Sequence, residues 1–183
     1  MFNKMQLLKR RFFAMRNGAV ADSLRRSGAP YRIIFGLNLP QIVEIARDFG
    51  PDASMAMELR ANTTTRESML IAPMLFPVES LTPAMAVEWL KEAPTPEVVD
   101  VVCLKLVKNM EGAEDVVKEL AESENSLHRY AAVRLGANLL PRYIDLVEQV
   151  TRREAERRDP MTMTACAMLL DDIEWRREEE EEK

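Results

Sequence analysis

Hydrophobic residues recur at helical spacing along almost the whole chain. In residues 3–16 the apolar positions Met5, Leu8, Phe12 and Met15 lie three or four residues apart, which places them on one side of an α-helix. The same spacing predicts further helices at residues 19–26, 40–49, 53–61, 65–76, 82–89, 95–108, 113–122, 126–140, 142–157 and 161–171. We therefore predict ten or eleven short helices and no strand.

Cap and breaker residues agree with this division. Thr95-Pro96 begins one helix with a capping hydroxyl followed by proline at the first helical position. Pro73 falls inside an otherwise apolar helix, which it should kink or shorten. The run VVDVVCLKLV is rich in β-branched residues and has some strand character. Its Thr-Pro-Glu start and its helical neighbours favour a helix.

Helices of this length, joined by short turns, are typical of stacked helix pairs. We predict an all-α fold, a HEAT- or ARM-like right-handed superhelix of antiparallel helix pairs, that is, an α-solenoid. No internal repeat is regular enough to prove this, and a compact irregular bundle is the alternative. The 183 residues suit one domain, which we place at residues 1–172. Residues 173–183 should form a charged tail, since five consecutive glutamates at 178–182 repel one another.

Composition excludes several classes of protein. Cys103 and Cys166 lie far apart in apolar runs, as buried, reduced thiols do in cytoplasmic proteins. One histidine and no CxxC argue against a zinc site, so we expect no metal. Nucleotide-binding and hydrolase motifs are missing, and we expect no cofactor. The chain lacks a long apolar run and a signal-peptide pattern, which predicts a cytoplasmic location and no membrane contact.

Positive charge is concentrated near the N-terminus. Residues 1–35 carry eight Lys or Arg and one acid, a net charge of +7, whereas the whole chain is at −5. Lys9, Arg10 and Arg11 are therefore candidate contacts to nucleic-acid phosphates or to an acidic protein partner. The alternative is that these residues form the solvated side of amphipathic helices.

Two side chains are candidates for chemistry from their local sequence. Asp100 is embedded among valines near the edge of the predicted core stripe. It is either a partly desolvated functional carboxylate or an exposed first-turn acid that the helix dipole favours. His128, the single histidine, has no Ser or Cys partner in a recognisable motif, so we expect a surface or cap-adjacent role.

Four segments occur in an order that resembles one known family. They are FGLNLPQIVEIARDFG, ANTTTRESMLIAPMLF with Arg66 and Glu67, TPEVVDVVCLKLV, and SLHRYAAVRL. In this order they resemble the AlkD-like DNA alkylation repair family, glycosylases built from HEAT-like helix pairs. The resemblance spans residues 35–140, and the chain is shorter than is usual for that family.

The resemblance implies roles for particular residues. The family's carboxylate, which stabilises positive charge on the sugar as the glycosidic bond breaks, falls on Asp100. A groove arginine that contacts phosphate falls on Arg129, and both side chains should face a common hollow. Aromatic rings that attract cationic alkylated bases are lost, because Pro96 and Met168 stand where the family has tryptophan. Asp171 replaces an arginine and inverts a charge that should face phosphate.

Three functions remain open from the sequence. The favoured one is a divergent, non-catalytic module that binds nucleic-acid backbone or a protein partner. The second is an active DNA N-glycosylase that removes alkylated bases with Asp100 as its carboxylate. The third is a protein-interaction scaffold that never contacts nucleic acid. A shortened stack would also expose an apolar end, which makes a homodimer an expectation to test.

Overall fold

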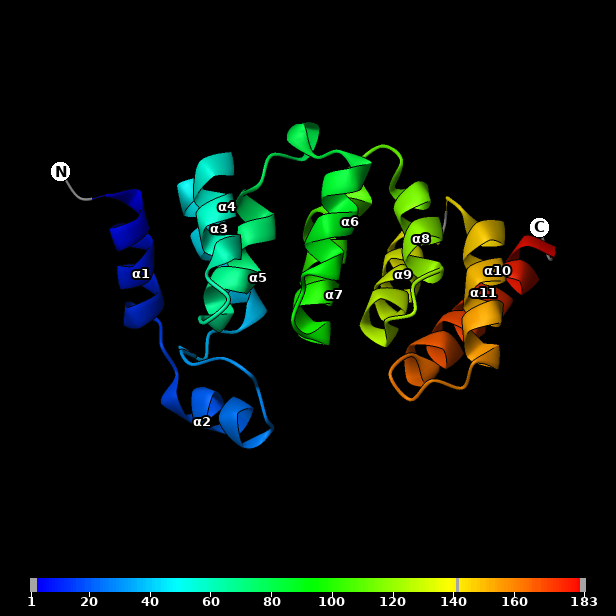
Figure 1. Ribbon diagram of the computed structural model, residues 1–183, viewed down its shortest axis with the longest axis horizontal. Coiled ribbons are helices and arrows are strands. Elements are labelled where there is room, and N and C mark those ends of the chain that lie inside the picture. The colour runs from blue at the N-terminus through cyan, green and yellow to red at the C-terminus, as the bar shows by residue number, and fades with distance from the viewer. Residues whose placement is uncertain (1–2, 141, 182–183) are drawn as a thin grey trace. The chain divides into compact units, whose positions relative to one another are not determined.

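The computed structural model describes residues 3–140 and 142–181, and within them every regular element is helical (Figure 1). The α-helices are α1 (Lys4–Ala14), α2 (Gly18–Arg26), α3 (Leu39–Phe49), α4 (Ala53–Ala61), α5 (Arg66–Leu75), α6 (Pro83–Lys91), α7 (Pro96–Lys105), α8 (Ala113–Ala121), α9 (Ser126–Leu139), α10 (Ile144–Glu156) and α11 (Met163–Glu181). Single 3₁₀ turns lie at η1 (Val78–Ser80) and η2 (Val107–Asn109). The all-α prediction is confirmed.

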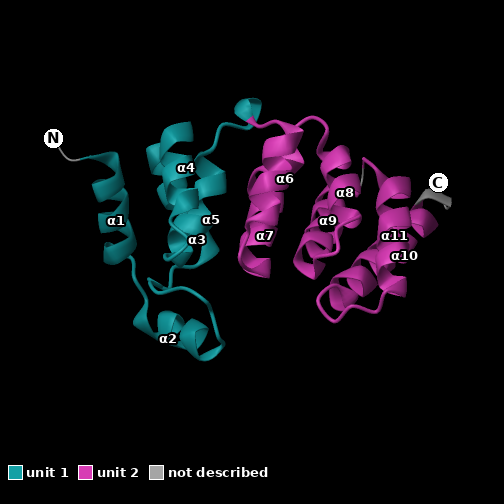
Figure 2. Ribbon diagram, viewed as in Figure 1, with its two compact units in different colours: residues 1–80 teal, residues 81–183 magenta. Residues whose placement is uncertain are grey.

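The chain divides into two compact units, residues 1–80 and residues 81–183 (Figure 2). Unit 1 holds α1 to α5, and unit 2 holds α6 to α11. Each unit has its own buried apolar residues. The single domain over residues 1–172 stays a prediction.

Local sequence signals position the helix starts. Within residues 3–140 and 142–181, side chains at seven N-caps accept a hydrogen bond from a backbone N–H of the first turn, which satisfies a donor that has no partner inside the helix. These caps are Asn3, Asn17, Asn38, Asp52, Thr82, Thr95 and Asn125. Pro73 lies inside α5, which ends two residues later at Leu75, and the predicted kink or shortening at the proline stays a prediction.

Helix α5 is buried on nearly all sides and organises unit 1. Its Arg-Glu start holds the loop that precedes α3. The fully buried Glu67 carboxylate accepts hydrogen bonds from the backbone N–H groups of Phe35 (3.0 Å), Gly36 (2.9 Å) and Leu37 (3.3 Å). Arg66 donates to the Leu37 carbonyl and to Glu67, both at 3.0 Å. Because buried polar groups need partners, this pair is part of the architecture of unit 1.

Gly36 is required where this loop crosses the start of α2. Its φ of +79° lies in the left-handed region, and a Cβ at this position would lie 2.2 Å from the backbone oxygen of Asn17. Only glycine combines that conformation with so close a backbone approach.

Unit 2 is built from three helix pairs in two layers. Helix α8 packs on α9 and α10 packs on α11, while α6 packs on both α7 and α8. Contacts between successive helix pairs place α6, α8 and α10 in one layer and α7, α9 and α11 in the other. Helices α9, α10 and α11 enclose an apolar cluster, formed by Val133, Leu140, Val147, Cys166, Leu169 and Ile173.

Helix α11 continues ten residues beyond the predicted end at residue 171, and that prediction was wrong. Ile173 is buried in the apolar cluster, so the helix gains core contacts past the predicted end. Arg176 pairs with Asp172 one turn earlier, and Arg177 pairs with Asp145 and Glu148 of α10. Most of the predicted tail is therefore helical, and residues 182 and 183 lie outside the described part of the chain.

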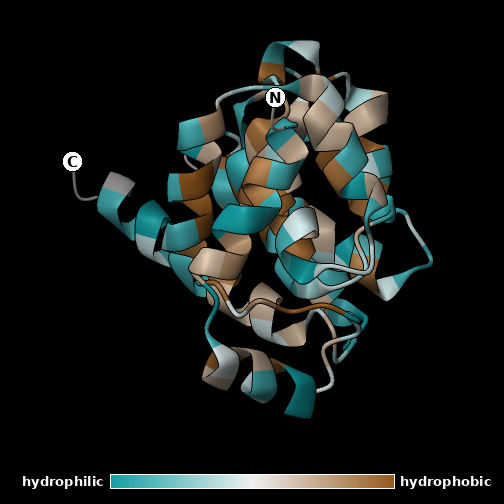
Figure 3. Ribbon diagram, turned by 90° about the vertical axis from the view of Figure 1, so that its left-hand side faces the viewer, coloured by the Kyte–Doolittle hydropathy of each residue, from teal (hydrophilic) through white to brown (hydrophobic). Residues whose placement is uncertain are grey.

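Hydrophobic and hydrophilic residues occur together on the helices that face the viewer in Figure 3. Cys103 and Cys166 are both buried and unpaired with each other, which confirms the expectation of buried thiols. Among the described residues, no helix has the length and apolar character needed to span a bilayer.

Candidate functional site

Asp100 lies at the edge of the unit 2 core, on the layer formed by α7 and α9. Its neighbours Val99 and Val102 are buried, whereas 37% of the Asp100 side chain is exposed. Two side chains of α9 reach it from one helical turn apart. The Tyr130 hydroxyl lies 3.1 and 3.2 Å from the two carboxylate oxygens, and Arg134 Nε lies 2.7 Å from Oδ1. Both oxygens of Asp100 are thus engaged.

The electrostatics of this cluster favour a closed ion pair. Burial, followed by the charge of Asp100, raises the pKa of Tyr130 to about 12. Burial by itself lowers the pKa of Arg134, but the hydrogen bond and charge of Asp100 outweigh it, so the net shift is upward. Burial also raises the pKa of Cys103, whose thiol lies 3.8 Å from the Ala131 carbonyl oxygen. Tyrosine and thiol therefore stay protonated and the guanidinium stays charged at neutral pH.

Arg129 does not share this cluster, so the predicted common hollow is wrong. Consecutive residues on a helix point about 100° apart, and Tyr130 is the one that faces Asp100. Arg129 is 6% exposed and points to α10, where its Nε lies 3.1 and 3.0 Å from the two carboxylate oxygens of Glu154. Its Nη2 lies 2.5 Å from Asp159 Oδ2.

The remaining donors of Arg129 are also satisfied inside the protein. Nη1 donates to the carbonyls of Ser123 (2.9 Å) and Glu124 (2.8 Å). The Thr162 hydroxyl donates to Glu154 at 2.9 Å, so the network joins α9, α10 and the turn before α11. These contacts favour a structural role for the arginine, and its contact with phosphate stays a prediction. The nearby hydroxyl of Ser126, a backbone N–H and Arg129 itself lower the pKa of Asp159.

His128 has a structural position beside the start of α9. Its Nδ1 lies 2.9 Å from the hydroxyl of Ser123, and its Nε2 lies 3.1 Å from the Lys91 carbonyl oxygen. The cap-adjacent position expected for this residue is confirmed.

The predicted basic residues of α1 differ in their surroundings. Lys9 and Arg10 are exposed. Arg11 turns toward α3, where its Nη2 lies 2.6 Å from Asp48 and 3.7 Å from Glu44. Arg11 is therefore already neutralised by neighbouring carboxylates.

An exposed aromatic ring accompanies these cations. Phe13 is 58% exposed, and the guanidinium carbon of Arg16 lies 3.8 Å from the centre of its ring. Such a stack keeps the cation near the apolar surface without removing its charge.

The two units differ in charge. Residues 1–80 contain 11 Lys or Arg and 7 acids, a net +4, whereas residues 81–183 contain 14 and 23, a net −9. Asp100 therefore belongs to the acidic unit, and the exposed cations of α1 belong to the basic one.

The positions matched to the family's aromatic residues carry no ring. Pro96 is the exposed first residue of α7, and Met168 on α11 is 67% exposed. Trp89 is buried in α6, and Trp175 is 54% exposed on α11. Tyr130 is the aromatic side chain that contacts Asp100.

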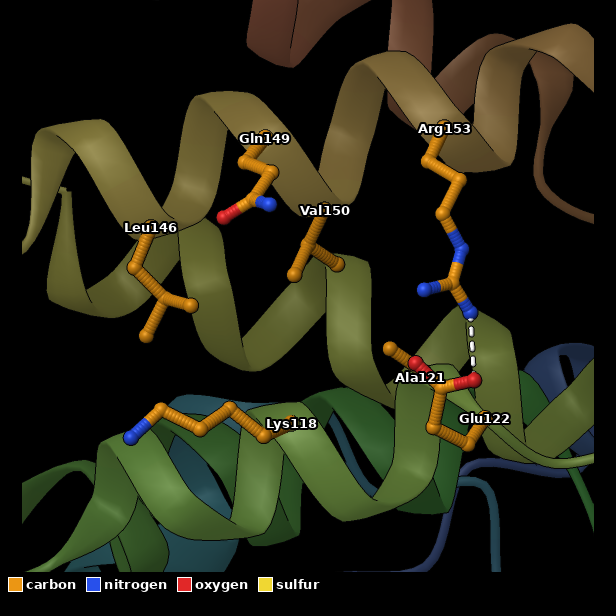
Figure 4. A pocket seen from close by; sticks show the side chains of 7 residues that line it. All are labelled: Lys118, Ala121, Glu122, Leu146, Gln149, Val150 and Arg153. Carbon is orange, nitrogen blue, oxygen red and sulfur yellow. Dashed lines mark ion pairs between the residues drawn. The ribbon is translucent and has the colours of Figure 1, made fainter.

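A separate hollow of about 250 Å³ lies on the other layer of unit 2, between α8 and α10 (Figure 4). Ala121, Leu146 and Val150 form its apolar lining. The cations at its edges have internal partners, because Lys118 lies 2.8 Å from Asp115 and Arg153 lies 2.6 Å from Glu122. In the described part of the chain, no group of three or more His, Cys, Asp or Glu could hold a metal ion.

Comparison with models of known protein families gives a match over most of this chain. The model of the family described as DNA alkylation repair enzyme matches residues 8–183. The chain belongs to this family. The match confirms the resemblance drawn from the four sequence segments and extends it through α11. No match was found among curated proteins or solved structures.

For this member of the DNA alkylation repair enzyme family, the sequence did not identify two residues that contact Asp100, namely Tyr130 and Arg134. Both residues lie in the segment SLHRYAAVRL, which carries part of the family resemblance, but the arginine of the family's motif falls on Arg129. Their spacing of four was a usable signal, because residues i and i+4 share a helix face. The spacing alone does not determine how α9 is rotated relative to α7, and this rotation decides which of its residues face Asp100.

Proposed function

We propose that this protein is a non-catalytic member of the DNA alkylation repair family that binds DNA through its sugar–phosphate backbone. The observation that carries the proposal is the engagement of Asp100 by Arg134 and Tyr130. A glycosylase carboxylate stabilises positive charge as it develops on the sugar. A guanidinium 2.7 Å away offsets that negative charge and repels the developing cation.

The basic unit supplies the proposed DNA contacts. Lys9 and Arg10 are exposed on α1, and Arg16 stacks on Phe13 beside them. Cations of this kind bind phosphates without reading sequence, and their binding weakens as salt displaces them. Unit 2, at −9, repels phosphate and makes a poor DNA groove. The helix pairs of unit 2 support a HEAT-like stack, and the unpaired cysteines support a cytoplasmic location.

Two measurements test the proposal together. We expect no release of alkylated bases from N-methylated duplex DNA at high protein concentration, with the wild type and Asp100→Asn alike. We expect DNA affinity to fall with salt, and Lys9→Ala/Arg10→Ala to weaken binding and reduce the salt slope by about two. Lys105→Ala/Lys108→Ala, a matched pair in the acidic unit, should bind as the wild type does.

Base release that Asp100→Asn abolishes would overturn the proposal and establish the second candidate, an active glycosylase. That candidate is favoured by the survival and partial exposure of Asp100 at the family's carboxylate position. The third candidate, a protein-interaction scaffold, is favoured by the acidity of unit 2. Absence of any salt-dependent DNA binding would select it.

A further inference from the structure

The outward side of α11 combines exposed apolar and acidic residues. Cys166, Leu169 and Ile173 bury one side of the helix in the apolar cluster of unit 2. On the opposite side Met168 is 67% exposed and Trp175 is 54% exposed. Their separation of seven residues, two helical turns, places both on one stripe.

Acidic residues share this stripe. Asp171 lies between the two apolar residues along the helix, Glu178 lies one turn beyond Trp175, and both acids are exposed. Arg176 and Arg177 turn to the flanks, where they pair with Asp172 and with α10. We call Met168, Asp171, Trp175 and Glu178 the α11 face. Exposed apolar patches that are rimmed by polar residues mark interaction sites, and the α11 face has this composition.

The outward side of α1 carries the complementary chemistry. Met5, Leu8 and Phe12 are buried, so the opposite side of the helix is turned outward. Leu7 is 40% exposed and Phe13 is 58% exposed there, with Arg10 on the same side. Leu7, Arg10 and Phe13 are called the α1 face. Helix α1 contains no acidic residue.

We propose that the α11 face of one molecule binds the α1 face of a second copy, head to tail. Trp175 and Met168 would pack on Phe13 and Leu7, while Asp171 and Glu178 pair with Arg10 and its neighbours. The alternative of two α11 faces together would oppose like charges, which costs binding energy. Charge complementarity therefore favours a heterologous contact, in which each copy offers two different surfaces.

A heterologous contact does not stop at a dimer unless a ring closes. The wild-type chain should therefore show a mass, in sedimentation velocity without DNA, that rises with concentration beyond the dimer. Trp175 emission should shift to shorter wavelength over the same range as the indole leaves water. Because Arg10 is part of this contact, DNA and a second copy compete for α1. The assembly itself does not depend on DNA binding.

Blocking one face at a time gives the decisive experiment. Phe13→Glu removes the α1 face and Met168→Glu removes the α11 face, and each variant alone should stay monomeric. An equimolar mixture of the two should form a complex of two chains, because one intact face of each kind remains. Met57→Glu, a matched change at an exposed methionine of α4, should assemble as the wild type does.

Circular dichroism verifies that each variant remains helical, and Arg10→Glu provides a second block on α1 that keeps the apolar side chains. A wild-type chain that is monomeric at the highest concentration reached overturns the proposal. So does self-association of Phe13→Glu alone, which would indicate pairing of two α11 faces. A mixture of the two blocked variants that stays monomeric also overturns it.

Discussion

The buried network around Arg129 gives the strongest prediction of stability. Arg129→Met keeps a long side chain but removes every charged donor from a guanidinium that is 6% exposed. The Glu154 carboxylate, with 5% of its side chain exposed, would keep the Thr162 hydroxyl and Arg157, whose Nε lies 3.3 Å away. It would lose the two hydrogen bonds from Arg129 Nε.

The expected loss follows from this geometry. Removing one partner of a buried ion pair costs about 3–5 kcal/mol, because the other charge stays desolvated. Arg157 can still offset part of the Glu154 charge, so we expect about 3 kcal/mol. For a chain of this size that corresponds to a melting temperature lower by about 6–12 °C.

Urea and thermal unfolding followed by circular dichroism measure the loss. Arg134→Met is the matched control on the same helix, since its pair with Asp100 is 37% exposed on both sides and should cost less than about 1 kcal/mol. Arg129→Met/Glu154→Leu should recover much of the lost stability, because no buried charge remains unpaired. If Arg129→Met were no more destabilising than Arg134→Met, the structural assignment of Arg129 would be refuted.

Three further predictions concern the backbone, a tyrosine and acid stability. Gly36→Ala should cost about 2–4 kcal/mol in urea unfolding, and Gly28→Ala, with a similar positive φ but open space around it, only about 1 kcal/mol; equal losses would contradict the steric argument. Asp100→Asn should bring the pKa of Tyr130 down from about 12, which NMR titration of the ring detects, and an unchanged value would exclude an influence of that charge. Because the folded-state pKa of Asp159 is lowered, its stabilising effect is present above about pH 4 and disappears as the pH falls through the folded value. Asp159→Asn should therefore give a melting temperature that varies less with pH below about pH 4, and identical slopes would count against this ion pair.

Most of the helical framework could be predicted from the chain alone. Local signals act within about four residues, so they can be recognised in the sequence without any tertiary contact. They include caps such as Thr95, breakers such as Pro73 and the spacing of apolar residues. The position of Asp100 at the edge of the core followed from the same periodicity. Family membership likewise rested on segments that can be read in order along the sequence.

Contacts between helices decided the rest. Arg129 and Tyr130 are neighbours in sequence, yet one closes a buried network with α10 and the other contacts Asp100 on α7. The choice depends on how α9 is rotated against both helices, and that rotation is set by packing across the whole core rather than by local spacing. Helix α11 continues past residue 171 for the same reason, because burial of Ile173 and pairing with α10 stabilise turns that their own sequence leaves exposed and acidic.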